Sequence, residues 1–175
     1  MQAQSIAPSL TTTGRAQEID GPDGAPADIP SLVDHIVERY HRTHLRELSV
    51  AIHLAQDVER LYASDLKCPR GLAGFLSELA QDLEAHQWRE EMMLFPLVRI
   101  GTPACQDLVT RRMTDDHAEL DIQVMALKGF NDSFRPSFEA PFCWQALSFM
   151  CRKLETDLRA HAHLEHEVLY ALLQP

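Results

Sequence analysis

EAHQWREEMMLFP, residues 84–96, carries a histidine and a glutamate four positions apart, His86 and Glu90. RAHAHLEHEVLY, residues 159–170, repeats this spacing with His161 and Glu165. Four residues are just over one helical turn, so each pair projects from one face of its helix. In both stretches that face is otherwise apolar. An imidazole beside a carboxylate on a core-facing stripe, present twice, is what a two-metal site inside a helical bundle requires.

The rest of the chain predicts an all-α fold. Four long segments carry apolar residues at helical spacing, and no stretch alternates convincingly at period two as a strand would. They run from about Pro30 to Ala63, Gly71 to Ile100, Pro103 to Lys128 and Pro141 to Leu173. Because the connections are mostly short, we expect an up-down-up-down four-helix bundle over residues 30–175. Residues 1–29 are rich in Ala, Gly, Pro and Thr without periodicity, which predicts a flexible arm.

Two further histidines, His41 and His117, lie on the apolar stripes of the first and third helices. Measured from the end of the bundle that the four segments share, the four stripe histidines lie at depths of about 17 to 21 Å, at about 1.5 Å per residue. These depths agree to within about one helical turn, and the two glutamates stay in the same layer. The candidate metal ligands are therefore His41, His86, Glu90, His117, His161 and Glu165.

The residue types of this layer indicate iron. Burying two carboxylates and four imidazoles is costly unless partners compensate, and a pair of cations removes that cost. Nitrogen and oxygen ligands without thiolate suit iron or manganese, and less often zinc. Two bridging carboxylates and two imidazoles per metal leave open positions for a small ligand such as dioxygen or nitric oxide. We predict two iron ions, oxo- or hydroxo-bridged; a metal-free bundle with packed histidines is the weaker interpretation.

Other polar residues near the stripes give weaker signals. His44 is expected at the boundary of the core, or else as an outer partner of the site. Asp121, one turn after His117, is either a solvated acid or an acceptor that orients that histidine. The residues expected to point away from the site are His163 and His166. Packing is the expected role of Tyr40, Trp88 and Trp144.

Composition and charge argue against several classes of protein. The chain has 16 basic and 26 acidic residues, for a net charge of −10, and an acidic surface disfavours nucleic acid and anionic membranes. No apolar run approaches the about 18 residues of a membrane span. The N-terminus does not read as a secretory signal, and the 4 cysteines form no CxxC pair. We therefore expect free thiols and a cytoplasmic location.

In combination, these motifs resemble the hemerythrin-like HHE cation-binding domains, and more closely the iron-sulfur cluster repair family of di-iron proteins. The resemblance covers about residues 32–172 and is carried by DHIVERYHRTH, DVERLY, PRGLAGFL, LEAHQWREEMMLFP, DDHAELD and RAHAHLEHEVLY. It implies that the family's ligands fall on the six residues given above, with both glutamates bridging the irons. It also implies that His41 and His161 hold one iron, and that His86 and His117 hold the other.

The chain departs from the family pattern at two places. Some members carry a further histidine where this chain has Tyr62, a position about 31 Å from His41 along a continuous helix. It cannot share the site, so we expect no effect on metal binding. Longer members begin with a small domain that contains adjacent cysteines, whereas residues 1–29 contain none. Roles that need those cysteines are therefore not expected of this chain, and a monomer is favoured.

The resemblance implies a non-haem di-iron protein of the nitric oxide response. Such a protein would bind nitric oxide at the iron pair, supply iron to damaged iron-sulfur proteins, or both. The first alternative is an oxygen-binding or oxygen-sensing protein, although typical hemerythrins use five histidines and only four reach the layer here. The second is a di-iron nitric oxide reductase or oxidase, for which no substrate channel is readable from the sequence.

Overall fold

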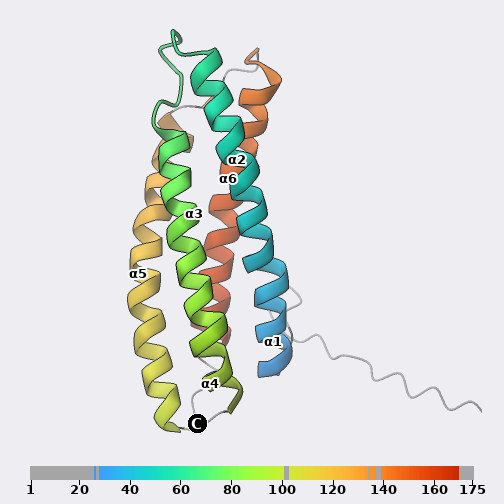
Figure 1. Ribbon diagram of the computed structural model, residues 1–175, viewed down its shortest axis with the longest axis vertical. Coiled ribbons are helices and arrows are strands. Elements are labelled where there is room, and N and C mark those ends of the chain that lie inside the picture. The colour runs from blue at the N-terminus through green and yellow to red at the C-terminus, as the bar shows by residue number, and fades with distance from the viewer. Residues whose placement is uncertain (1–25, 27, 101–102, 134, 137–138, 170–175) are drawn as a thin grey trace, which may run out of the picture.

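The computed structural model describes Pro26 and residues 28–100, 103–133, 135–136 and 139–169. Within these residues every regular element is a helix, and the helices form four antiparallel rods (Figure 1). The prediction of an all-α, up-down-up-down bundle is confirmed. The predicted flexible arm, residues 1–29, falls almost wholly outside the described residues.

Each rod is a single run of helix. The first rod consists of α1 (Ile29–Ile36), the π-helical turn η2 (Val37–His41) and α2 (Arg42–Leu61). The second consists of α3 (Leu72–Arg89), the π-helical turn η3 (Glu90–Leu94) and α4 (Phe95–Ile100). The third is α5 (Pro103–Ser133), and the fourth is α6 (Phe142–His163) followed by the π-helical turn η4 (Leu164–Leu169). Because α2 packs against α3 and α6, and α5 packs against the same two helices, the rods close a ring (Figure 1).

Local sequence explains the ends of these helices. The backbone N–H of Ser31 donates to Asp28 Oδ1 at 3.0 Å, so Asp28 caps α1 as its sequence position predicts. Gly71 precedes α3 with a φ of 89°, a conformation that glycine adopts without steric cost. The predicted end of the third helix at Lys128 is wrong, because α5 continues to Ser133. Packing of the Phe130 ring, 5.3 Å from that of Phe75, accompanies this extra turn.

Buried apolar side chains form two clusters at different heights of the bundle. The larger lies between α2, α3, α5 and α6 and includes Leu48, Leu76, Leu79, Leu83, Leu127, Leu154 and Leu158. The smaller lies at the end of the bundle that holds α1 and α4 and includes Leu32, Ile36, Tyr40, Phe95, Val98 and Leu169. Buried histidines and glutamates occupy the layer between the clusters.

In the described part of the chain, a π-helical turn interrupts three of the four rods at the height of this polar layer. A π turn bonds residue i to residue i+5, so it adds one residue and shifts the buried stripe beyond it. Regular helical spacing from His86 and Glu90 predicts that Met93 is the next buried residue, which is wrong, since Met93 is 57% exposed and Leu94 and Val98 are buried instead. Pro96 favours this break, because it lacks an N–H and crowds the carbonyl four residues before it.

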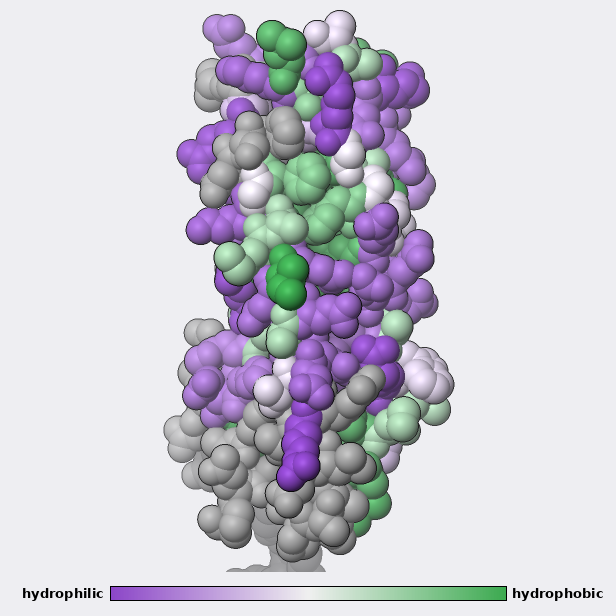
Figure 2. Space-filling view, turned by 90° about the vertical axis from the view of Figure 1, so that its left-hand side faces the viewer, coloured by the Kyte–Doolittle hydropathy of each residue, from purple (hydrophilic) through white to green (hydrophobic). Residues whose placement is uncertain are grey.

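The aromatic residues and the outer surface complete the fold. Tyr40 and Trp144 are buried as expected, but the prediction that Trp88 packs in the core is wrong, because it is 59% exposed. Two residues after His86, it points to the opposite side of α3. Figure 2 shows a mostly polar face with an apolar area above its middle. No helix in the described ranges combines the length and apolarity needed to cross a bilayer.

Truncating a leucine of the larger cluster tests this description of the core. Leu154 is 1% exposed, so Leu154→Ala should leave a cavity and lower the free energy of unfolding by about 2 to 5 kcal/mol. Phe149 lies on the same helix but is 63% exposed. Phe149→Ala should therefore change the free energy of unfolding by less than about 0.5 kcal/mol. Urea unfolding followed by circular dichroism measures both, and equal losses would contradict the assigned core.

Candidate metal centre

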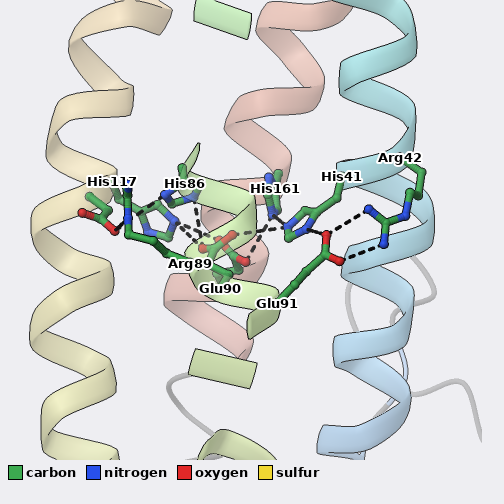
Figure 3. A network of polar contacts seen from close by, with 10 residues as sticks. His41, Arg42, His86, Arg89, Glu90, Glu91, His117 and His161 are labelled. Carbon is green, nitrogen blue, oxygen red and sulfur yellow. Dashed lines mark hydrogen bonds and ion pairs between the residues drawn. The ribbon is translucent and has the colours of Figure 1, made fainter. Parts of the chain in front are cut away.

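The structure places all six predicted residues in the polar layer. Each rod contributes at least one of them: His41 comes from η2, His86 from α3, Glu90 from η3, His117 from α5, His161 from α6 and Glu165 from η4. All six side chains are buried, and those of Glu90 and Glu165 are 0% exposed. Figure 3 shows the histidines on either side of Glu90, pointing toward the middle of the bundle. Their role as metal ligands stays a prediction at this point.

The candidate ligand atoms fall into two overlapping groups. The first is formed by His41, Glu90, His161 and Glu165, and the second by His86, Glu90, His117 and Glu165. Within each group the ligand atoms lie within 4.8 Å of one another. Both glutamates belong to both groups, so they lie between two pairs of histidines. This is the pairing that the family resemblance implies.

Each glutamate directs one oxygen toward each histidine pair. Glu90 Oε1 lies 3.0 Å from His86 Nε2, and Glu90 Oε2 lies 3.4 Å from His41 Nε2. Glu165 Oε2 lies 2.8 Å from His117 Nε2, and Glu165 Oε1 lies 3.2 Å from His161 Nε2. In all four histidines, the nitrogen that faces these oxygens is therefore Nε2. Two carboxylates in this position are placed to bridge two cations.

The polar atoms of the layer lack ordinary hydrogen bonds. Among the described residues, the oxygens of Glu90 and Glu165 and the nitrogens of His86 and His117 have their close polar contacts with other candidate ligands of the layer, and these contacts do not have the geometry of hydrogen bonds. Leaving a buried polar group in this state costs about 1 to 3 kcal/mol. Buried polar groups in native proteins nearly always have partners, and a layer of closely spaced carboxylates and imidazoles such as this one offers the donors that a cation needs. The residues present therefore fit a metal site.

The pKa shifts of Glu165 and His41 favour the forms that bind a cation, whereas the shift of His86 opposes it. Burial would raise the pKa of the Glu165 carboxyl, but His161 and His117 beside it hold that pKa well below its ordinary value. Burial, together with the neighbouring His161, lowers the pKa of His41. The pKa of His86 is shifted the other way, because Glu90 outweighs the effect of burial. Ionised carboxylate and neutral imidazole are the forms that bind metals.

A carboxylate lies directly behind His41. The Nδ1 of His41 lies 3.0 Å from Glu91 Oε1, and Arg42 donates to the two oxygens of Glu91 at 3.1 and 2.8 Å (Figure 3). Burial would raise the pKa of Glu91, but the hydrogen bonds from His41 and Arg42 hold it below its ordinary value. A ligand histidine whose outer nitrogen donates to a carboxylate has its ring orientation fixed.

On the other side of the layer, a carboxylate paired with an arginine also lies behind His86, but at a longer distance. Arg89 Nε donates to Asp116 Oδ2 at 3.2 Å, and the same oxygen lies 3.9 Å from His86 Nδ1. A cavity of about 130 Å³ between α3 and α5 is lined by these three residues and by Asp82 and Glu119. His86 is thus buried but lies next to a cavity with an acidic lining.

His44 also belongs to the layer, contrary to the expectation of a boundary position. It is fully buried, its ring centroid lies 5.4 Å from that of His161, and its nitrogens have no hydrogen-bond partner among the described residues. Burial lowers the pKa of His44 to about 3. His44 lies three residues after His41, so regular helical spacing places both on the inner face of this rod, and Leu45 is half-buried.

Three other expectations are resolved, two near the end of the fourth rod and one on α5. His166 was expected to point away from the site, which is wrong, because its ring centroid lies 4.7 Å from that of His117 and it is half-buried. It lies within η4, where the π turn changes the direction of the side chains. His163 is exposed as predicted, and Asp121 is also exposed, which favours the solvated acid of its two interpretations.

The charged residues outside the layer were not found from the sequence. They are Arg42, Arg89, Glu91 and Asp116, and each directly precedes or follows a predicted ligand. This adjacency is the signal that could have found them. However, neighbours on an α-helix point about 100° apart, and a charged neighbour is normally solvated. Only the packing of the rods shows that Glu91 contacts the outer nitrogen of His41 and that Asp116 lies 3.9 Å from that of His86.

The fold and the site together define a class of protein: a four-helix bundle with a buried layer of histidines and glutamates suited to cations. Residues 32–173 match the hemerythrin HHE cation binding domain, so the chain belongs to this family. Curated proteins similar to the chain include iron-sulfur cluster repair proteins.

Three of these relatives show how far the similarity extends. The chain is 31% identical over 148 residues (85% of its length) to a probable iron-sulfur cluster repair protein of Haemophilus influenzae. It is 31% identical over 144 residues (82%) to the iron-sulfur cluster repair protein YtfE of Musicola paradisiaca. It is 31% identical over 145 residues (83%) to the iron-sulfur cluster repair protein DnrN of Neisseria gonorrhoeae. The chain spans 66% and 65% of the first two relatives, just under two thirds, and 91% of the third.

Proposed function

We propose that this chain is a non-haem di-iron protein that serves the repair of iron-sulfur centres under nitrosative stress. It would bind nitric oxide at the iron pair, supply iron for repair, or both. The observation that carries the two-metal proposal is the pair of overlapping ligand groups that share both glutamates. The names of the relatives support the link to iron-sulfur cluster repair.

The proposed ligand set assigns a role to each residue of the layer. His41 and His161 would hold one ion, His86 and His117 would hold the other, and the two glutamates would supply ligands to both. When bound, iron supplies open coordination positions for a diatomic ligand. The chain keeps the donors in a fixed arrangement, because each of them lies on a helix that packs against two others.

Aromatic side chains limit the access of water to one half of this site. The ring of Phe95 stacks on His41 with centroids 5.7 Å apart, and the ring of Tyr40 stacks on His161 with centroids 5.1 Å apart. Both aromatic residues belong to the smaller apolar cluster. The low local polarity strengthens the attraction between the carboxylates and a cation.

Iron loading tests the metal part of the proposal. The protein would be reconstituted with Fe²⁺ without oxygen, desalted, and examined by iron quantification and Mössbauer spectroscopy. We expect about two irons per chain in the wild type and a loss of iron in His41→Ala. His53→Ala is the matched control, because His53 lies on the same rod but is exposed, and it should retain the iron. A wild-type protein that takes up no iron would overturn the proposal.

Nitric oxide binding and iron supply need separate measurements. Titrating the reduced, iron-loaded protein with nitric oxide should produce iron-nitrosyl absorption. Iron supply can be followed as the recovery of activity of an apo iron-sulfur enzyme, incubated with the loaded protein, sulfide and thiol. A loaded protein that neither responds to nitric oxide nor restores the apo enzyme would refute the proposed role. A positive result in one assay alone identifies which of the two activities it has.

A further inference from the structure

We infer that Glu91 is a positioning residue. By fixing the ring of His41, it makes the half of the metal centre that contains His41 and His161 retain its ion more strongly than the other half. This inference rests on the two-metal proposal above. It adds a difference between the two halves in how strongly each retains its ion, which the ligand set alone does not predict.

The hydrogen bond to Glu91 determines which nitrogen of His41 is free to bind a metal. A carboxylate that is ionised can only accept a hydrogen bond, so the proton of the neutral imidazole lies on Nδ1, 3.0 Å from Glu91 Oε1. The lone pair is then on Nε2, which lies 3.4 Å from Glu90 Oε2 and 3.2 Å from His161 Nε2. Glu91 thus holds His41 in the tautomer and orientation that the site needs, and it makes Nε2 a stronger donor.

Glu91 is itself held in place. Arg42 binds its two oxygens at 3.1 and 2.8 Å, and such a two-pronged contact fixes the plane of a carboxylate. The side chain of Glu91 is 22% exposed, whereas that of Arg42 is 51% exposed. The pair therefore links the first rod to the second at the edge of the layer, with His41 on its inner side (Figure 3).

No other candidate ligand has such an anchor in the described part of the chain. The Nδ1 atoms of His86, His117 and His161 have no hydrogen-bond partner there. The nearest equivalent is Asp116, but its Oδ2 lies 3.9 Å from His86 Nδ1, beyond hydrogen-bond distance. Of the two halves, only the one with His41 therefore contains a histidine whose ring is oriented by a carboxylate.

The surroundings of the two halves also favour stronger retention of the ion in the His41 half. Tyr40 and Phe95 cover His161 and His41 with their rings, whereas His86 lines the cavity between α3 and α5. An ion in the His86 half thus has weaker orientation of its ligands and a shorter path to solvent. We expect this ion to leave first, and the ion in the His41 half to leave later.

Removal of iron by a chelator tests this inference. With an excess of ferrozine, the iron-loaded wild type should lose its two ions in two kinetic phases of equal size. Glu91→Gln keeps the shape of the side chain but removes its charge, so the slow phase should become about 10- to 100-fold faster, the usual effect of losing such an outer partner. Asp116→Asn is the matched control on the other half and should leave the slow phase unchanged.

A spectroscopic readout separates positioning from a general structural effect. In the zinc-loaded, ¹⁵N-labelled wild type, long-range ¹H–¹⁵N correlations should show His41 protonated at Nδ1, with a hydrogen-bonded Nδ1 proton. That proton should shift or broaden in Glu91→Gln, while circular dichroism shows the same helix content and the His86 and His117 signals stay in place.

The outcomes distinguish this inference from the proposal on which it rests. A wild type that binds no iron overturns the two-metal proposal itself. A wild type that binds two irons but releases them in a single phase overturns the difference between the two halves, and so does a Glu91→Gln variant with an unchanged slow phase. Acceleration by Asp116→Asn equal to that by Glu91→Gln would overturn the specific role of Glu91.

Discussion

Glu165→Gln is expected to leave the protein unable to hold a pair of metal ions. Glu165 is fully buried and belongs to both ligand groups, with one oxygen toward His117 and the other toward His161. Glutamine preserves the size of the side chain but removes the charge and one oxygen donor from the middle of the site. Because both ions lose a ligand, we expect affinity to fall by more than the about 100-fold typical of losing an outer partner.

The measurement is iron content after desalting, together with calorimetric titration of the apo protein with Fe²⁺ in the absence of oxygen. Glu167→Gln provides the control, since Glu167 lies on the same π turn but is exposed, and it should bind iron like the wild type. If Glu165→Gln retained both irons with unchanged affinity, Glu165 could not be a shared ligand.

Removal of the metal should produce the second large effect, a loss of thermal stability. A ligand that binds only the folded state stabilises it by about 4 kcal/mol at a concentration of about 1,000 times its Kd. For a chain of this size, about 1 kcal/mol corresponds to about 2 to 4 °C in Tm. Each ion should therefore raise Tm by roughly 8 to 16 °C under those conditions. The buried polar atoms that lack hydrogen bonds explain why the apo protein is the weaker state.

Thermal unfolding followed by circular dichroism, with and without Fe²⁺ under anaerobic conditions, measures this difference. Zn²⁺ should also raise Tm, because nitrogen and oxygen donors bind it as well. In Glu165→Gln the metal-dependent part of Tm should be lost or strongly reduced. Identical Tm values for the apo and iron-loaded wild type would show that the buried layer is stable without a cation.

Much of the candidate site could be predicted because an α-helix has a constant rise. Counting residues from the helix ends placed His41 and His117 at the same depth as His86 and His161, although the four lie far apart in the sequence. The spacing of four residues likewise placed His86 and Glu90 on one face. These inferences need only regular geometry, and a ring of packed helices then brings the side chains together.

The features that could not be predicted from the sequence depend on departures from regular α-helical geometry. A π turn forms where tertiary packing compensates for its weaker local bonding, and apart from Pro96 next to η3 no local signal marks where it falls. Each one changes the direction of the side chains within and beyond it, which is why Met93 is exposed and why His166 lies next to the layer. The pairing of Arg42 with Glu91 joins two rods, so it also depends on how the rods pack.

The polar layer divides the apolar interior of the bundle into two parts, and this division affects how the protein opens. Because α1 and α4 pack mainly in the smaller cluster, they form a unit that can separate from the remainder when nothing joins the four rods at the layer. Together, the two ions would crosslink side chains from every rod and so would couple the two parts into one cooperative structure. Amide hydrogen exchange in α1 and α4 would then report metal occupancy, and the loss of an ion would begin with fraying at that end.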